Sequence, residues 1–126
     1  MCGIAGIVGK GTIAQVRNMT DAISHRGPDG EGIVQSGTCT LGHRRLSIVD
    51  LSTGDQPMYA ADRKKVIAFN GEIYGYKKIR DSISHYKFAT TSDTEVILAL
   101  YEEYGENLFL HLPGMFALAL WDETKQ

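Results

Sequence analysis

The sequence has few cysteines, little net charge and no long apolar run, and each shortage excludes a class of protein. Two cysteines, Cys2 and Cys39, are too few for a disulfide scaffold, and no histidine stands at a zinc-type spacing from them. A formal net charge of -2 gives no electrostatic reason to expect nucleic acid as a partner. No apolar stretch approaches the roughly 18 residues of a membrane span, and no leader-type segment is recognisable. We therefore expect a cytoplasmic protein, with neither nucleic acid nor membrane as a partner, that binds small polar ligands.

The 126 residues, of which 43% are hydrophobic, are enough for one domain with a real core, and we expect a single domain over 1–126. The run GIAGIV at 3–8 has the length of a buried strand. Short apolar stretches on either side of Ser36-Gly37 predict a hairpin. Residues 66–69 form a β-prone run, and the continuous apolar character of 115–121 predicts a strand covered on both faces.

Capping residues mark the helices. Thr12 is expected to cap a helix that stops before the loop at Gly27-Pro28. The tetrapeptide Ser92-Asp93-Thr94-Glu95 has the pattern of a capping box, and Gly105 is placed to end the helix that it begins. Residues 75–82 are also compatible with a helix. Strands and helices are interleaved without a regular βαβ cadence, which predicts the α+β class.

Cys2 is the first candidate for chemistry. Removal of Met1 by methionine aminopeptidase would leave Cys2 with a free α-amine, and an α-amine titrates closer to neutrality than a lysine side chain. Nucleophile and general base would then belong to one residue. If Met1 stays attached, the Cys2 nitrogen is an amide and cannot be the base. His43 is an alternative base, as in Cys-His hydrolases, and the position of Cys2 is also compatible with chance.

Two further strings have competing interpretations. Residues 9–14 match GxGxxA, a dinucleotide-binding pattern, but the helix that follows runs into RGPDGEG instead of a second strand with an acidic end. Asn70-Gly71 follows the β-prone run, so that we expect the strand to end at Asn70. The pair is either a hairpin turn or an oxyanion hole built from the Asn side chain and the next backbone N–H.

Charged residues offer a clamp for an amino acid. Arg44 and Arg45 form either a solvated basic pair or a site in which a guanidinium holds an α-carboxylate through two parallel hydrogen bonds. Asp93 falls in the first turn of a helix, where the macrodipole favours it, and it could equally bind a substrate ammonium.

Taken together, the motifs resemble the glutaminase domain of class II glutamine amidotransferases, most closely that of glutamine-hydrolysing asparagine synthetases. The strings that carry the resemblance are MCGIAGIV at 1–8, SHRGPDGEG at 24–32, LGHRRLSIVDLSTGDQPM at 41–58, FNGEIYGYKKIR at 69–80, TSDTEVILALYEEYG at 91–105 and LPGMFALALWDE at 112–123.

The resemblance implies the N-terminal nucleophile hydrolase fold, two packed antiparallel sheets between helices (αββα), with Cys2 at the start of a central strand. Residues 26–28 would shape a loop beside the site without reacting. Six residues would form the site for L-glutamine. Cys2 would be the nucleophile, with its own amine as the base, and Asn70 and the Gly71 N–H would form the oxyanion hole. Arg45 would bind the substrate carboxylate, and Asp93, with Glu72 nearby, would bind the ammonium.

The implied reaction converts glutamine to glutamate and ammonia through a γ-glutamyl thioester, with no cofactor and no metal. ATP would belong to a synthetase domain absent from these residues, and the ammonia would pass to such a domain or subunit. The sequence departs from the family pattern at Gly75, where Asn is usual, and family domains continue beyond the WDE string. We therefore expect an incomplete second sheet with an exposed apolar edge at 115–121, through which copies could associate. The alternative is a non-catalytic fragment that keeps the glutamine-binding motifs as a binding or interaction module.

Overall fold

The computed structural model describes residues 1–47 and 52–126, so Asp50 and Leu51 of the polar segment before Pro57 lie outside the described residues. The elements in chain order are β1 (Gly3–Val8), α1 (Ile13–Ala22), a 3-10 helix (Ser24–Arg26), β2 (Gly30–Ser36), β3 (Cys39–Arg45), β4 (Met58–Tyr59), β5 (Lys65–Ile73), α2 (Tyr76–Ser82), α3 (Asp93–Tyr104), a second 3-10 helix (Gly105–His111) and β6 (Gly114–Asp122).

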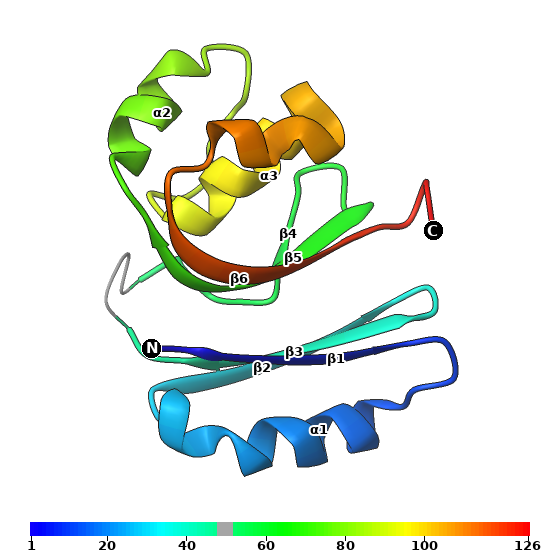
Figure 1. Ribbon diagram of the computed structural model, residues 1–126. Coiled ribbons are helices and arrows are strands. Elements are labelled where there is room, and N and C mark those ends of the chain that lie inside the picture. The colour runs from blue at the N-terminus through cyan, green and yellow to red at the C-terminus, as the bar shows by residue number, and fades with distance from the viewer. Residues whose placement is uncertain (48–51) are drawn as a thin grey trace.

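Two antiparallel sheets lie face to face between helices, as Figure 1 shows. The first sheet has the strand order β1-β3-β2 and the second the order β4-β5-β6. Helix α1 covers the outer face of the first sheet, and α2, α3 and the second 3-10 helix cover the outer face of the second. This layering confirms the α+β class and the αββα arrangement.

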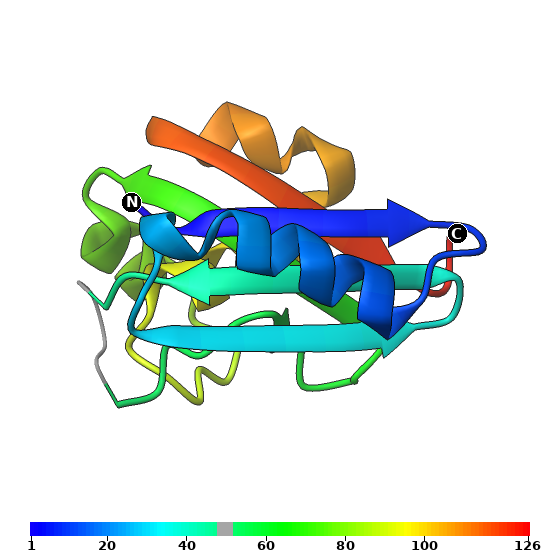
Figure 2. The same cartoon turned by 90° about the horizontal axis from the view of Figure 1, so that it is seen from below.

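The first sheet follows the sequence pattern closely. Strand β1 has the predicted bounds, and β2 and β3 form the predicted hairpin, with Ser36 opposite Cys39. Thr12 caps α1 through a complete capping box with Gln15, and Figure 2 shows the helix lying along the sheet. All strands of this sheet are antiparallel, so the dinucleotide-binding interpretation of 9–14 is wrong, since that fold requires parallel strands.

The position of β1 in the sheet corrects one expectation. In the described residues β1 pairs with β3 alone and is an edge strand, whereas a central strand would pair on both sides. Its burial is also incomplete, because Val8 at its far end is 66% exposed. Cys2 therefore precedes an edge strand of the first sheet.

Strand β5 is buried on both faces because its side chains alternate between two cores. Val66 and Ala68 pack between the sheets with Cys39 and Leu41. The residues of the opposite face pack beneath α3, and they are Ile67, Phe69 and Ile73. This alternation assigns Asn70 to the face of β5 that is directed at the first sheet.

The predicted end of this strand is wrong. Strand β5 continues through Asn70 and Gly71 to Ile73, with Asn70 opposite Ala117 and Gly71 opposite Phe116 in β6. The hairpin interpretation of Asn70-Gly71 fails with it, because the residues that follow do not fold back on the strand. Gly71 has φ 148, and a Cβ there would lie 2.3 Å from a backbone oxygen of β6, so glycine is required for close approach of two strands and not for a turn.

Strand β6 packs on both faces, as predicted, beyond its first residues. One set of its side chains packs against the core beneath α3 and the other against the core between the sheets: Phe116, Leu118 and Leu120, and Ala119 and Trp121. Among the described residues the strand lies at the edge of the second sheet, and Met115 near its start is 60% exposed. Most other residues of the strand are half-buried. An apolar edge of the predicted kind is therefore present, and association of copies through it stays a prediction.

Helix α3 begins and ends where the sequence predicts, with a difference at its cap. The Ser92 hydroxyl accepts from the Thr94 N–H at 3.1 Å, and Gly105 ends the helix with φ 58. The Glu95 carboxylate does not complete the capping box, because it accepts the N–H groups of Ala89 and Thr90 and anchors the preceding loop. No helix in the described part of the chain combines the length and the apolar character that crossing a membrane requires.

Candidate active site

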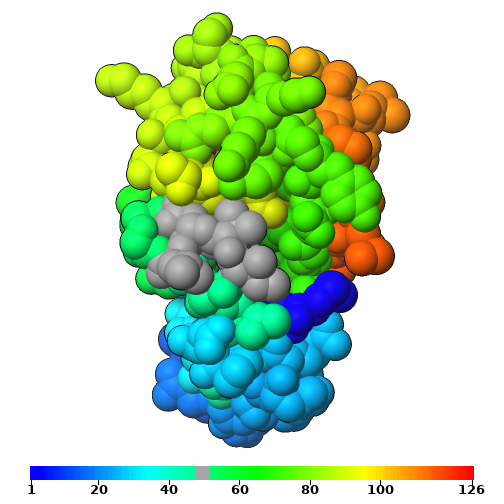
Figure 3. Space-filling model, turned by 90° about the vertical axis from the view of Figure 1, so that its left-hand side faces the viewer, coloured from blue at the N-terminus to red at the C-terminus, as the bar shows by residue number. Residues whose placement is uncertain are grey.

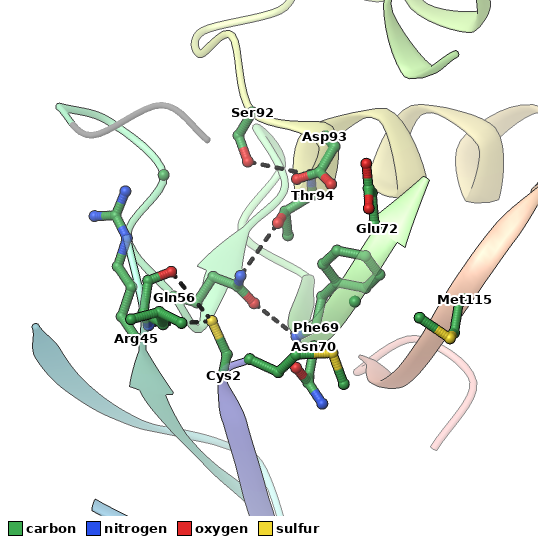
Figure 4. Close-up of a pocket in the computed structure, with 14 residues that line it drawn as sticks. Cys2, Arg45, Gln56, Phe69, Asn70, Glu72, Ser92, Asp93, Thr94 and Met115 are labelled. Carbon is green, nitrogen blue, oxygen red and sulfur yellow. Dashed lines mark hydrogen bonds between the residues drawn. The ribbon is translucent and has the colours of Figure 1, made fainter. Parts of the chain in front are cut away.

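A pocket lies where the N-terminal end of β1, the middle of β5 and the first turn of α3 come together, as Figure 4 shows. Its volume of ≈ 140 Å³ is space for about five water molecules, the size class of a free amino acid. All six predicted site residues line it, and they are Cys2, Arg45, Asn70, Gly71, Glu72 and Asp93. Residues far apart in the sequence therefore converge on one cavity.

Cys2 is half-buried and is held by the backbone that follows β3. The N–H of Leu46 donates to Cys2 Sγ at 3.2 Å, and Sγ lies 3.6 Å from the Leu46 carbonyl oxygen. Arg26 Nε donates to the Cys2 carbonyl oxygen at 3.0 Å, which agrees with a shaping role for the loop at 26–28. These contacts fix Sγ at the wall of the pocket beside Arg45.

Met1 also lines the pocket and is 58% exposed. Figure 3 shows the N-terminal end of the chain, in dark blue, at the surface between the layers of the two sheets. A peptidase can reach it there. While Met1 is attached, it takes up part of the pocket wall and the Cys2 nitrogen is a peptide amide.

Asn70 and Gly71 present polar groups from β5. Asn70 lies on the face directed at the first sheet, and its Oδ1 is buried with no hydrogen-bond partner in the part of the chain that the structure describes. Phe69 directs both of its backbone groups away from β6. Its N–H donates to Gln56 Oε1 at 2.6 Å, and its carbonyl oxygen lies 3.0 Å from His43 Nε2. Alternate residues of a strand point to the same edge, so the Gly71 N–H lies along this edge too, next to the pocket.

Asp93 is a buried carboxylate at the first turn of α3, 6% exposed. Burial raises its pKa, the nearby charge of Glu72 raises it further, and the backbone N–H groups of Thr94 and Ile73 act in the opposite direction. A ligand ammonium beside the two carboxylates would offset both the burial and the repulsion. This corner of the pocket is therefore suited to a cation.

The two arginines of β3 point to different parts of the molecule. Arg44 reaches α1, where its Nε donates to the Thr20 carbonyl at 3.1 Å and its guanidinium pairs with Asp21. Arg45 faces the pocket, its side chain is 11% exposed, and Nη1 pairs with Asp55 Oδ1 at 2.6 Å. The interpretation as a solvated basic pair is wrong, since both guanidinium groups are held by the fold.

His43 is not placed to activate Cys2. Its ring is fully buried, Nε2 lies 3.0 Å from the Phe69 carbonyl oxygen, and Nδ1 is buried with no partner among the described residues. Burial lowers its pKa to about 4, so the ring is neutral and donates from Nε2. The Cys-His alternative is therefore wrong, because neither ring nitrogen bonds the thiol.

Sequence reasoning missed three polar residues of the pocket, Gln56, Ser92 and Thr94. Gln56 lies in the loop before β4, inside the DQPM string, and its side chain bonds both β5 and α3. Thr94 was interpreted only as part of a cap. A buried polar side chain in a loop has no periodic signal, so only its membership of a recurring string could have indicated it.

A family model described as "Glutamine amidotransferase domain" matches residues 1–126. The glutamine-hydrolyzing asparagine synthetase of Triphysaria versicolor is 42% identical over 127 residues, which cover 97% of this chain and 22% of that protein. Asparagine synthetase 2 of Bacillus subtilis is 43% identical over 99% of this chain and 18% of its own length. The chain thus spans about a fifth of the length of these relatives.

A solved structure supports the fold. The glutamine phosphoribosylpyrophosphate amidotransferase from B. subtilis, in complex with ADP and GMP, superimposes with a TM-score of 0.81 over 95% of this chain and 35% of that one. At 21% sequence identity the likeness concerns the fold alone, and it confirms the predicted N-terminal nucleophile hydrolase architecture.

Proposed function

This chain belongs to the family of glutamine amidotransferase domains, and from that membership we propose that it hydrolyses the side-chain amide of L-glutamine to glutamate and ammonia. The observation that carries the proposal is the convergence of a cysteine, an Asn-Gly pair, an arginine and two carboxylates on one pocket of amino-acid size. Each charged or polar group of glutamine has a complementary group there.

Binding uses the two ends of the substrate. Arg45 holds the α-carboxylate, which takes the place on the guanidinium of Asp55, a carboxylate whose own side chain is 89% exposed. Asp93, with Glu72 beside it, holds the α-ammonium. With both charged groups fixed, the flexible chain of glutamine directs its amide at Cys2.

Chemistry begins when Cys2 Sγ attacks the amide carbon and the thiol proton passes to the α-amine of Cys2. The negative charge that develops on the amide oxygen is stabilised by the Asn70 side-chain amide and the Gly71 N–H. The α-amine then protonates the leaving nitrogen, the carbon–nitrogen bond breaks, and ammonia leaves a γ-glutamyl thioester. Water, deprotonated by the same amine, attacks the thioester, and glutamate and the free thiol are released. No metal or cofactor takes part in these steps.

Removal of Met1 activates the site. It frees the α-amine that the mechanism requires and clears the pocket wall on which Met1 lies. A second candidate function, a non-catalytic glutamine-binding module, is favoured by this same contact, because a chain that keeps Met1 retains the binding groups without a base.

In the cell the ammonia would serve an acceptor-activating partner. The matched relatives are named as glutamine-hydrolyzing asparagine synthetases and are about five times as long as this chain. We accordingly place the domain beside a synthetase-type domain or subunit, in the cytoplasm, where that partner and not this pocket would use ATP.

The experiment is a glutamate-release assay on protein for which the intact mass shows whether Met1 is present. Met1-free protein should release glutamate and ammonia in equal amounts, and Met1-retaining protein and the Cys2→Ala variant should not. If Met1-free protein binds glutamine but releases glutamate no faster than Cys2→Ala, the chain is a glutamine-binding module and not an enzyme.

A further inference from the structure

One side chain connects two walls of the pocket. Gln56 Oε1 accepts from the backbone N–H of Phe69 at 2.6 Å, and Gln56 Nε2 donates to Thr94 Oγ1 at 3.2 Å, as the dashed lines of Figure 4 show. Phe69 directly precedes Asn70 in β5, and Thr94 directly follows Asp93 in α3. Gln56 therefore joins the strand of the oxyanion groups to the helix end that carries the ammonium site.

The two hydrogen bonds of the Gln56 side chain, called here the Gln56 bridge, take the place of strand pairing that stops just before the pocket. Strand β4 pairs with β5 only as far as Met58 opposite Ile67, so beyond that point this edge of β5 has no partner strand among the described residues. Gln56, two residues before Met58, continues the ladder with its side chain by accepting the Phe69 N–H. His43 holds the Phe69 carbonyl from the other sheet. Both polar groups of the residue before Asn70 are thus fixed by side chains.

The base of the bridge is fixed as well. The Gln56 carbonyl rests directly on β2, where a Cβ on Gly32 would lie 2.1 Å from the carbonyl oxygen. Any side chain at Gly32 would push the loop away from the first sheet. Gln56 is therefore seated on one sheet while its amide bonds the other sheet and α3.

We infer that Gln56 is a positioning residue that sets the separation between the oxyanion hole and the ammonium site, an inference that rests on the proposed function. Glutamine has a fixed length, so a shift of β5 relative to α3 moves the amide carbon away from Cys2 Sγ even when both charged ends stay bound. A misplacement of about 1 Å can cost on the order of 10²-fold in rate. A merely structural Gln56 would affect stability and leave turnover per folded molecule unchanged.

The test uses Met1-free protein and four variants. Gln56→Met keeps the volume and loses both hydrogen bonds, Thr94→Val loses the acceptor alone, Thr94→Ser keeps the hydroxyl, and the fourth combines Gln56→Met with Thr94→Val. We expect kcat to fall roughly 10- to 100-fold in Gln56→Met and roughly 3- to 10-fold in Thr94→Val, and to recover in Thr94→Ser. The double variant should be no slower than Gln56→Met, because both changes break one bridge.

The control is the rate at which iodoacetamide alkylates Cys2, which needs no bound glutamine and reports the accessibility and the reactivity of the thiol; unfolding would raise this rate. That rate should stay within about twofold of wild type. Thr94→Val with wild-type kcat and KM, or effects of the two single changes that multiply in the double variant, would overturn the inference.

A second readout separates this inference from the proposed function. Hydrogen exchange of the Phe69 amide should be roughly 3- to 10-fold faster in Thr94→Val than in wild type, because the acceptor on Gln56 loses its anchor. Faster exchange in a protein that releases no glutamate would sink the proposed function and leave the bridge in place. Equal exchange in both proteins would remove the bridge, whatever the turnover.

Discussion

Gly71 and Gly75 offer a matched pair of substitutions that test the backbone on which the oxyanion hole depends. Both have positive φ, 148 at Gly71 and 65 at Gly75. A Cβ on Gly71 would lie 2.3 Å from the Met115 oxygen and 2.5 Å from the Phe116 Cα, whereas a Cβ on Gly75 would meet nothing within 4 Å. Alanine at either position therefore strains φ, and only Gly71→Ala also collides with a neighbouring strand.

The magnitudes follow from these contacts. Positive φ costs an alanine about 1–2 kcal/mol. The obstacles near Gly71 are backbone atoms that cannot rotate away, so β6 must withdraw by roughly 1 Å, an overpacking cost of about 1–3 kcal/mol. We expect Gly71→Ala to lose about 2–5 kcal/mol of unfolding free energy and Gly75→Ala about 1 kcal/mol. Gly75→Asn should be nearly neutral, because Asn tolerates the left-handed conformation that Gly75 adopts.

Thermal unfolding followed by circular dichroism measures the difference. At roughly 3–5 °C per kcal/mol for a domain of this size, Gly71→Ala should lower Tm by about 10–20 °C and Gly75→Ala by only a few degrees. Glutamate release per folded molecule should fall in Gly71→Ala and stay unchanged in Gly75→Ala. Equal Tm losses in the two variants would refute the close approach of β5 and β6 at Gly71.

Three further outcomes follow from buried groups. Asn70→Ala should lower kcat on the order of 10²- to 10³-fold with Tm close to wild type, because the Asn70 Oδ1 has no described partner to lose; steady-state kinetics and a melt check this. Burial raises the pKa of Asp93, so KM for glutamine should rise as pH falls through that pKa, since a protonated carboxyl no longer attracts the ammonium. The same shift contributes stability to the native state below the ordinary pKa of Asp, and that stability is lost as pH rises through the raised pKa. KM and urea titrations on wild type should show both trends, and Asp93→Asn, which has no carboxyl to titrate, should show neither. Burial lowers the pKa of His43 from 6.5 to about 4, so between these values the unfolded chain binds a proton that the native ring does not. The unfolding free energy should therefore fall by up to about 3 kcal/mol as pH is lowered from 6.5 to 4. His43→Gln should remove this pH dependence from urea-denaturation measurements.

Local signals predicted the helices well because a cap is decided by residues three or four positions apart. Thr12 and Ser92 begin α1 and α3, and Gly105 ends α3, as the sequence indicates. The strand end at Asn70 could not be found in this way. Whether β5 continues is decided by its partner β6, whose residue Ala117 faces Asn70 from far along the chain. A turn at Gly71 stayed an open alternative because the sequence does not show that a second strand passes beside it.

Six of the residues that line the pocket were predicted from the sequence, and the residues that support them were not. Resemblance of whole strings indicated Cys2, Arg45 and the others, since each lies in a recurring motif. The Gln56 bridge joins residues 13 and 38 positions away, and such contacts exist only after the sheets have packed. The pairing of Arg45 with Asp55 was missed too, because the position of Asp55 depends on how the loop before β4 folds back on β3.

Trapping the γ-glutamyl thioester tests most directly whether Cys2 is the nucleophile of glutamine hydrolysis. Met1-free chain is mixed with glutamine, quenched with acid within the first turnover, and measured by intact mass and by the mass of the N-terminal peptide. We expect an increment of one γ-glutamyl group on Cys2, which should be absent from Cys2→Ala and from protein that retains Met1. Glutamate release without any adduct on Cys2, at a rate that Cys2→Ala shares, would contradict this role of Cys2.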